Sequence, residues 1–268
     1  MRVLALLGGL AVASAAALRG AAETWRYTAA NQSLFLNQEK IVVRGITWRG
    51  LDTEIMAPLG LWRHSIEFYL DTLRSHGFNA VRLVLDEDWV VHKTHIPAFP
   101  CQVIWEPEGS SLDILDAVMD KTRRKQMYVV LSMERGGETA WDVILNRYGA
   151  YRNLLGIEAS HAVARKYASF PWLVMDGGAL FMPVIRPTTE LVNELYDEWD
   201  RAFGDRAANT TIVPRVTGGS VVFLRYFFSY LREHAIENVF MLQMDSDATG
   251  IFDGDDWTSI RQDITSLR

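Results

Sequence analysis

The stretch Gly77-Phe78-Asn79-Ala80-Val81-Arg82-Leu83-Val84-Leu85 takes the chain from a helix into a buried strand. Before it, residues 64–76 carry apolar side chains at the spacing of one helix face, and Gly77 supplies a stop signal. After the glycine, residues 80–85 are almost wholly apolar, as expected of a strand that is buried on both faces. A helix followed by such a strand is the repeating unit of a parallel sheet.

The same alternation continues along the chain. Further strands are predicted at residues 41–48, 127–131, 172–175, 211–213 and 238–242. Further helices are predicted at residues 111–125, with Ser111 as N-cap, and at residues 158–169, 189–203, 221–234 and 257–267. This order predicts one α/β domain over residues 23–268, either a doubly wound sheet or an α/β barrel. The sequence has neither a Gly-x-Gly-x-x-Gly after the first strand nor a Gly-Lys-Ser/Thr loop, so nucleotide binding has no support.

The composition and the N-terminal segment indicate which partners and which cellular location to expect. The chain has 268 residues, 49% of them hydrophobic, and a formal net charge of -6, which argues against a nucleic-acid partner. Residues 1–22 have the pattern of a signal peptide, and their apolar run is shorter than the roughly 20 residues of a membrane span. We therefore expect a secreted protein with no membrane anchor. Asn31 and Asn209 lie in glycosylation sequons, and Cys101, the single cysteine, is expected to be buried or to pair with another chain.

Two stretches early in the chain match the motifs of a known enzyme family. Arg44-Gly45-Ile46-Thr47-Trp48-Arg49-Gly50 resembles the opening "RG-x-N-W-x-G" of glycoside hydrolase family 5, the cellulase-type β-glucanases, with Thr47 in place of the Asn. The Gly77–Leu83 stretch is similar to "GFN-x-x-R-(L/I)-P", with Val84 in place of the Pro.

Two later stretches resemble the same family. Tyr128-Val129-Val130-Leu131-Ser132-Met133-Glu134-Arg135 is similar to "(V/I)-L-D-x-H-R", with Ser132 and Glu134 in place of the Asp and the His. Asp245-Ser246-Asp247-Ala248-Thr249-Gly250-Ile251-Phe252-Asp253-Gly254-Asp255-Asp256-Trp257 is similar to "N-S-G-D-T-G-G-(I/L)-L-x-x-D-W". All four stretches come in the family's order.

The resemblance implies a TIM-type (β/α)8 barrel with its site at the C-terminal ends of the strands. It also implies a retaining mechanism with a Glu acid/base in "N-E-P" after strand four and a Glu nucleophile in "G-E-(F/W/Y)-G" after strand seven. If residues 172–175 are strand four, Met182 takes the place of the acid, and Val216 takes the place of the nucleophile. Six strands are predicted rather than eight, so we expect an incomplete barrel that is shortened in the region of strands five to seven.

Several site-like residues remain. Arg82 matches the Arg that supports the nucleophile in the family, and it either keeps such a role or pairs with Asp86, Asp88 or Glu134. Phe240 matches a sugar-stacking Trp. Trp48 and Trp89 lie near predicted strand ends, so all four residues are candidates for substrate binding, with plain packing as the alternative for the three aromatic residues.

Two acids near strand ends and one acidic loop are further candidates. Glu134 and Asp176 follow predicted strands three and four and are the candidate substitutes for the lost catalytic pair. The acidic loop lacks the Gly at position six and the Glu at position twelve of a calcium-binding hand, so no metal or cofactor is predicted; its acids are Asp245, Asp247, Asp253, Asp255 and Asp256.

Three functions follow from these observations. The first is an inactive secreted relative of β-glucanases that binds β-glucan or acts as a decoy for a protein that targets the active enzyme. The second is an active glycosidase that uses Glu134 and Asp176. The third is a truncated gene product that folds poorly.

Overall fold

The fold is described from a computed structural model. It describes residues 25–92, 110–133, 135–167, 169–175, 180–185, 192–203, 210–216, 221–241, 252–253 and 256–257. The main sheet has eight strands in the order β10-β12-β13-β4-β5-β6-β7-β8, and every neighbouring pair is parallel. Their bounds in chain order are β4 Arg44–Trp48, β5 Ala80–Val84, β6 Tyr128–Ser132, β7 Leu154–Glu158, β8 Leu173–Met175, β10 Val184–Ile185, β12 Arg215–Val216 and β13 Val239–Met241.

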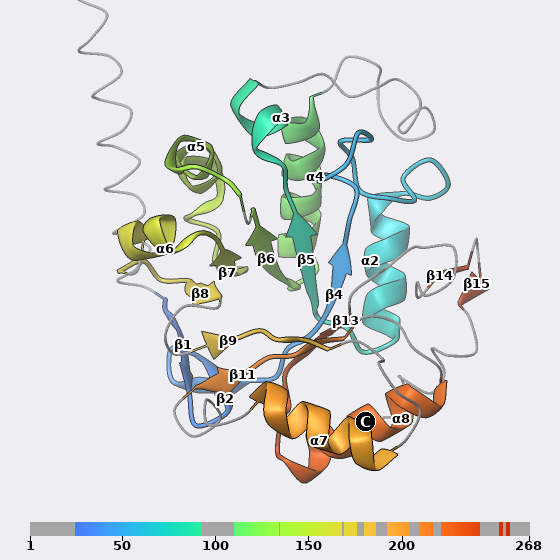
Figure 1. Ribbon diagram of the computed structural model, residues 1–268. Helices are drawn as coiled ribbons and strands as arrows, with labels where there is room; N and C mark the ends of the chain where they lie inside the picture. The colour runs from blue at the N-terminus through green and yellow to red at the C-terminus, as the bar shows by residue number, and fades with distance from the viewer. Residues whose placement is uncertain are drawn as a thin grey trace, which may run out of the picture.

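Helices connect these strands and lie outside the curled sheet (Figure 1). Their bounds are α2 Ile66–Ser75, α3 Glu87–His92, α4 Ser111–Arg124, α5 Glu138–Tyr148, α6 His161–Tyr167, α7 Val192–Phe203 and α8 Val221–Glu233. The fold is therefore a TIM-type barrel, as the family resemblance implies, and not a doubly wound sheet.

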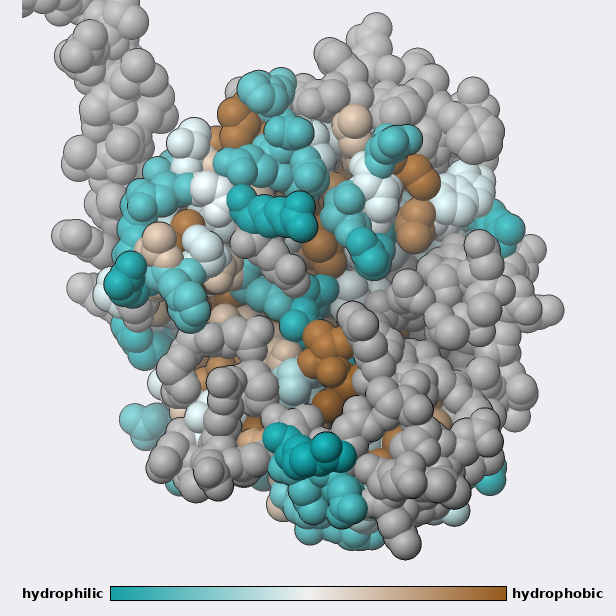
Figure 2. Space-filling view, in the orientation of Figure 1, coloured by the Kyte–Doolittle hydropathy of each residue, from teal (hydrophilic) through white to brown (hydrophobic). Residues whose placement is uncertain are grey.

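The barrel is open between β8 and β10, which are the two ends of the sheet. Only four residues separate β8 from the next strand, β9 (Leu180–Phe181), whereas a parallel neighbour needs a crossover of a dozen or more. The segment after β8 is thus too short to hold the helix that would connect β8 to a parallel neighbour in the sheet. Val184 on the edge strand β10 is 42% exposed, and Figure 2 shows hydrophobic side chains reaching the surface near the middle of this face.

Prolines interrupt the strands on the far side of the opening. β9 and β10 flank Pro183, and β11 (Thr211–Ile212) and β12 flank Pro214. Before the prolines, β9 pairs with β11, and after them β10 pairs with β12. The same two segments of chain therefore run side by side on both sides of the prolines. Proline has no N–H to donate to a ladder, which explains why each strand is split into two-residue pieces.

A small antiparallel sheet lies against this side of the barrel. It consists of β1 (Tyr27–Ala30), β2 (Ser33–Leu36) and β3 (Glu39–Ile41), joined by two-residue turns in which all four residues have positive φ. Tyr27 N donates to Pro171 O at 2.7 Å beside β8, and Ile212 N donates to Gln32 Oε1 at 3.0 Å at β11. This sheet therefore contacts chain on both sides of the opening.

The structure corrects several predicted elements. Residues 154–158 are a strand that the sequence analysis missed, so the helix predicted from residue 158 begins only at His161. Residues 173–175 become the fifth parallel strand from β4, not the fourth, and the main sheet has eight strands rather than six. Helix α5 was also missed. The N-cap of α4 is Ser110, not Ser111, and Ser110 forms a capping box with Asp113.

The predicted C-terminal helix at residues 257–267 lies outside the described residues, except that Trp257 belongs to a short strand. That strand, β15 (Asp256–Trp257), pairs with β14 (Phe252–Asp253). The position of Cys101 also lies outside the described residues.

Candidate active site

The register of the strands decides which side chains face the interior of the barrel. Thr47, Arg82 and Val130 are register partners on β4, β5 and β6, and successive side chains of a strand point to opposite faces. Two positions beyond Val130 on β6, Ser132 is the register partner of Glu158, so these two share the interior face with Arg82.

Arg82 is anchored to Glu158 and Ser132. Its Nε donates to Glu158 Oε2 at 2.8 Å, and its Nη2 donates to Ser132 Oγ at 2.8 Å and also to the same Glu158 oxygen. Among the described residues these contacts are with Glu158 and Ser132 rather than with Asp86 or Asp88, and the third predicted partner, Glu134, lies outside the described residues. A charge-assisted contact of this kind is stronger than a neutral hydrogen bond.

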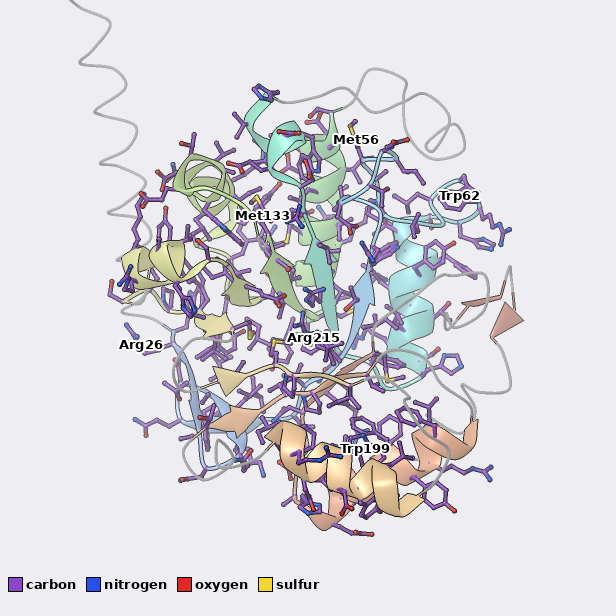
Figure 3. The ribbon with its side chains drawn as sticks, in the orientation of Figure 1. Arg26, Met56, Trp62, Met133, Trp199 and Arg215 are labelled. Carbon is purple, nitrogen blue, oxygen red and sulfur yellow. The ribbon has the colours of Figure 1, made fainter. Side chains whose placement is uncertain are left out.

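Arg215 reaches the same carboxylate from across the barrel. Its Nη1 lies 2.7 Å from Glu158 Oε1, and its Nε donates to Met182 O at 3.3 Å. Strands β12 and β7 are five places apart in the sheet, which would separate them by about 24 Å if the sheet were flat. The contact therefore spans the curled interior, and Figure 3 draws Arg215 near the centre of the molecule.

The three charged side chains form a buried cluster, hereafter the Arg82–Glu158–Arg215 cluster. Their side chains are 4%, 7% and 9% exposed. Burial alone would raise the pKa of Glu158, but the positive charges of Arg82 and Arg215 outweigh it and hold the pKa below its ordinary value. Glu158 is therefore ionised at neutral pH and has no proton to give to a leaving group.

The ends of β7 and β12 carry no free carboxylate. The true fourth strand is β7, and the chain after it reads Ala159-Ser160-His161-Ala162-Val163 rather than "N-E-P". The sequence has no Asp or Glu between Asp205 and Glu233, a range that includes β11 and β12.

The strand register also shows which residue of β12 faces the interior of the barrel. Val216 pairs with Met241, which pairs with Ile46, so Val216 belongs to the outer face of the sheet. Arg215, which the sequence analysis did not single out, is the interior residue there.

The three aromatic candidates are enclosed by protein. Trp48 and Phe240 are fully buried and Trp89 is 2% exposed. Trp48 shares the outer face with Leu83 and packs against Tyr69 of α2, and its Nε1 donates to Leu59 O at 2.8 Å. Phe240 lies inside, over Gly45 of the neighbouring strand.

The remaining candidates divide between exposed and undescribed positions. Asn31 is exposed in the turn between β1 and β2. Glu134, Asp176 and Asn209 lie outside the described residues, although Glu134 follows β6 and Asp176 follows β8 in the chain. Among the described residues, no group of His, Cys, Asp and Glu suits a metal ion.

Glu158 is the buried interior carboxylate that the sequence analysis missed. The apolar run Leu154-Leu155-Gly156-Ile157 before it is a strand signal of the same kind as residues 127–131. Recognising that run would have placed Glu158 at a strand end.

Solved structures of an endocellulase and an endoglucanase have the same fold as this chain. The hyperthermophilic endocellulase from the archaeon Pyrococcus horikoshii superposes with a TM-score of 0.75 at 16% identity, covering 91% of this chain and 98% of that one. The catalytic domain of the major endoglucanase from Xanthomonas campestris pv. campestris gives a TM-score of 0.69 at 20% identity, covering 85% and 94%. This chain has the cellulase fold of glycoside hydrolase family 5. No family model and no curated protein sequence matches it.

Another structure of the Pyrococcus endocellulase holds cellotetraose, and it matches this chain with a TM-score of 0.72 at 17% identity over 91% and 97% of the two chains. Within the part of the chain that the structure describes, each helix is too short or too polar to span a bilayer. The fold is thus that of a cellulase, while the interior carries an ion-pair cluster in which the one carboxylate is held by two arginines.

Proposed function

We propose that this protein is a secreted β-glucan-binding relative of the cellulases that does not hydrolyse its ligand. The observation that carries the proposal is the Arg82–Glu158–Arg215 cluster. Glu158 is the one carboxylate among the buried described residues, and both of its oxygens are bound by arginine. In this proposal Glu158 serves as the counter-ion of the two arginines, and the buried described residues offer no second carboxyl group to complete a catalytic pair.

The retaining reaction needs two carboxyl groups about 5–5.5 Å apart, one protonated and one ionised. The family's nucleophile follows strand seven, which corresponds to β11 and β12 here. Because residues 206–232 contain no Asp or Glu, no shift of the alignment around β12 supplies a nucleophile. Loss of "N-E-P" after β7 removes the acid/base. In this proposal Arg82, which supports a nucleophile in the family that the sequence resembles, has Glu158 as its counter-ion instead.

Binding is supported by the fold and by the loops at the C-terminal ends of the strands. A cellulase with this fold binds cellotetraose. In this chain Trp62 lies half-buried on the loop between β4 and α2, where Figure 3 labels it, and indole rings offer a flat apolar face to sugars. We assign Trp62 to the glucan contact in place of the buried Trp48, Trp89 and Phe240. No described surface favours the decoy role.

An active enzyme is the alternative, and one observation bears on it. Glu134 follows β6 and Asp176 follows β8, so the strands before them flank β7.

The test uses residues 23–268 with cellotetraose and with soluble β-1,4-glucan. We expect binding in calorimetry and no reducing sugar above background. Release of sugar that disappears in the Glu134→Gln/Asp176→Asn double variant would establish the alternative. If neither release nor binding is seen, the binding proposal is wrong and only the fold is shared.

A further inference from the structure

Arginine and tyrosine side chains gather at the N-terminal ends of β6 and β7. Arg123 and Arg124 end helix α4, Tyr128 is the first residue of β6, and Tyr151 and Arg152 lie on the loop between α5 and β7. We call these five residues the basal arginine patch. The patch lies at the opposite end of these two strands from the Arg82–Glu158–Arg215 cluster.

Contacts between neighbouring members make the patch continuous. The guanidinium carbon of Arg123 lies 5.2 Å from the centre of the Tyr151 ring, a cation–π distance. Strands β6 and β7 pair in parallel, so the segments that lead into them run side by side. Burial raises the pKa of Tyr128, and the positive charge of Arg152 opposes that rise, as expected of a guanidinium near the phenol oxygen.

The patch carries more positive than negative charge. Asp120 pairs with both Arg123 and Arg124, whose side chains are 55% and 75% exposed. Arg152 is also exposed, and within the described residues no acid forms an ion pair with it. Three arginines and one aspartate leave a net charge of +2, in a chain whose formal net charge is -6. The helix dipole favours cations in the last turn of α4, but it does not account for Arg152, which lies in a loop.

The two tyrosines add neutral hydrogen-bonding groups beside these charges. Tyr128 and Tyr151 are half-buried, and neither hydroxyl has a hydrogen-bond partner in the part of the chain that the structure describes. A tyrosine hydroxyl can donate and accept, as a sugar hydroxyl can, while a guanidinium binds a carboxylate through two parallel hydrogen bonds. The combination fits a sugar that carries a carboxylate.

We propose that the basal arginine patch binds an acidic polysaccharide. In this arrangement Arg124 and Arg152 bind the carboxylates of its uronic-acid units, and Tyr128 and Tyr151 bind its hydroxyl groups. Repeating carboxylates suit arginines that come from two separate segments, whereas a neutral glucan would leave both without a counter-ion. The patch lies away from the C-terminal strand ends where we place the glucan contact, so either site can fail without the other.

Binding of polygalacturonate to residues 23–268 at low ionic strength tests the charged contacts. We expect the Arg124→Gln/Arg152→Gln variant to bind about fivefold more weakly than the wild type, because two exposed charge pairs are lost. The control is Arg63→Gln/Arg135→Gln, which removes the same charge from exposed arginines at the opposite strand ends and should bind as the wild type does. Both variants should bind cellotetraose equally well.

A second variant tests whether the patch recognises sugar rather than charge alone. Tyr128→Phe/Tyr151→Phe should weaken polygalacturonate binding by about threefold, because two hydrogen bonds are lost. The same variant should leave unchanged any binding of polyglutamate, which carries carboxylates without sugar hydroxyls.

Other results would overturn the proposal. No binding of polygalacturonate by the wild type, or equal weakening in the two arginine variants, would show that the patch is not its site. Equal binding of polyglutamate and polygalacturonate by the wild type would show that the patch attracts anions in general. Binding to phosphatidylserine vesicles without binding to polygalacturonate would assign the patch to an anionic membrane surface.

Discussion

Replacing Glu158 with Gln isolates the energetic role of the Arg82–Glu158–Arg215 cluster. The substitution keeps the shape of the side chain and removes the one negative charge between two buried arginines. Removing one partner of a buried ion pair leaves uncompensated charge and costs about 3–5 kcal/mol. In a domain of this size each kcal/mol lowers Tm by about 2–4 °C, so we expect a fall of roughly 6–20 °C.

The assay is urea unfolding at pH 7, with Glu138→Gln as the matched control. Glu138 lies 3.3 Å from Lys166 and is 58% exposed, so the same substitution there should cost no more than about 1 kcal/mol. The Glu158→Gln/Arg215→Met double variant should lose less than the sum of its two single variants, because the second change removes one of the unbalanced charges. If Glu158→Gln lowers the free energy of unfolding by as little as the control does, the cluster does not stabilise the folded barrel and the reasoning is refuted.

The destabilisation caused by Glu158→Gln should also depend on pH. Burial would raise the pKa of Glu158, but the two arginines hold it below the ordinary value of a glutamate. A lowered folded-state pKa contributes stability that is present above the unfolded value and is lost as the pH falls through the folded value. The difference in unfolding free energy between the wild type and Glu158→Gln should therefore be full at pH 7 and shrink below about pH 4.

Three further predictions concern other parts of the molecule. In Gly45→Ala the new methyl group would lie 2.1 Å from a ring atom of Phe240, so we expect a loss of about 1–3 kcal/mol in urea unfolding, whereas Gly149→Ala, at a helical φ of -62°, should be near neutral. Trp62→Ala should weaken cellotetraose binding by about fivefold, or roughly 1 kcal/mol, while Tyr226→Ala on α8 should leave it unchanged; equal effects would remove Trp62 from the site. Asn31 is exposed, so protein secreted from a eukaryotic host should lose mass on glycosidase treatment, and Asn31→Gln should carry one glycan fewer than the wild type; unchanged mass would exclude this sequon.

The repeating helix-and-strand pattern could be predicted because its signals are local. Gly77 has a φ of +86° and ends α2, and the apolar residues on either side of it form the helix and strand that their spacing indicates. Family resemblance then chose the barrel over the doubly wound sheet, which periodicity alone leaves open.

The missed parts depend on information that is not local. The pieces on either side of Pro183 and Pro214 are two residues long, too short for any periodicity to register. The partner of Arg82 could not be predicted either, because Glu158 lies two strands away in the sheet and was taken as the start of a helix. The role of Arg215 depends on the curling of the whole sheet, which brings the side chain of Arg215 on β12 to Glu158 on β7.

The most direct test of the central claim is reducing-sugar release from soluble β-1,4-glucan by residues 23–268, measured over a long incubation beside an active endocellulase. The account predicts release at background in wild type and in the Arg82→Ala variant alike, because the one buried carboxylate of the described residues, Glu158, is bound by arginine and the family's two glutamates are replaced. Release by the wild type that is lost in Arg82→Ala would contradict it, and would show that acids near Arg82 still perform the reaction.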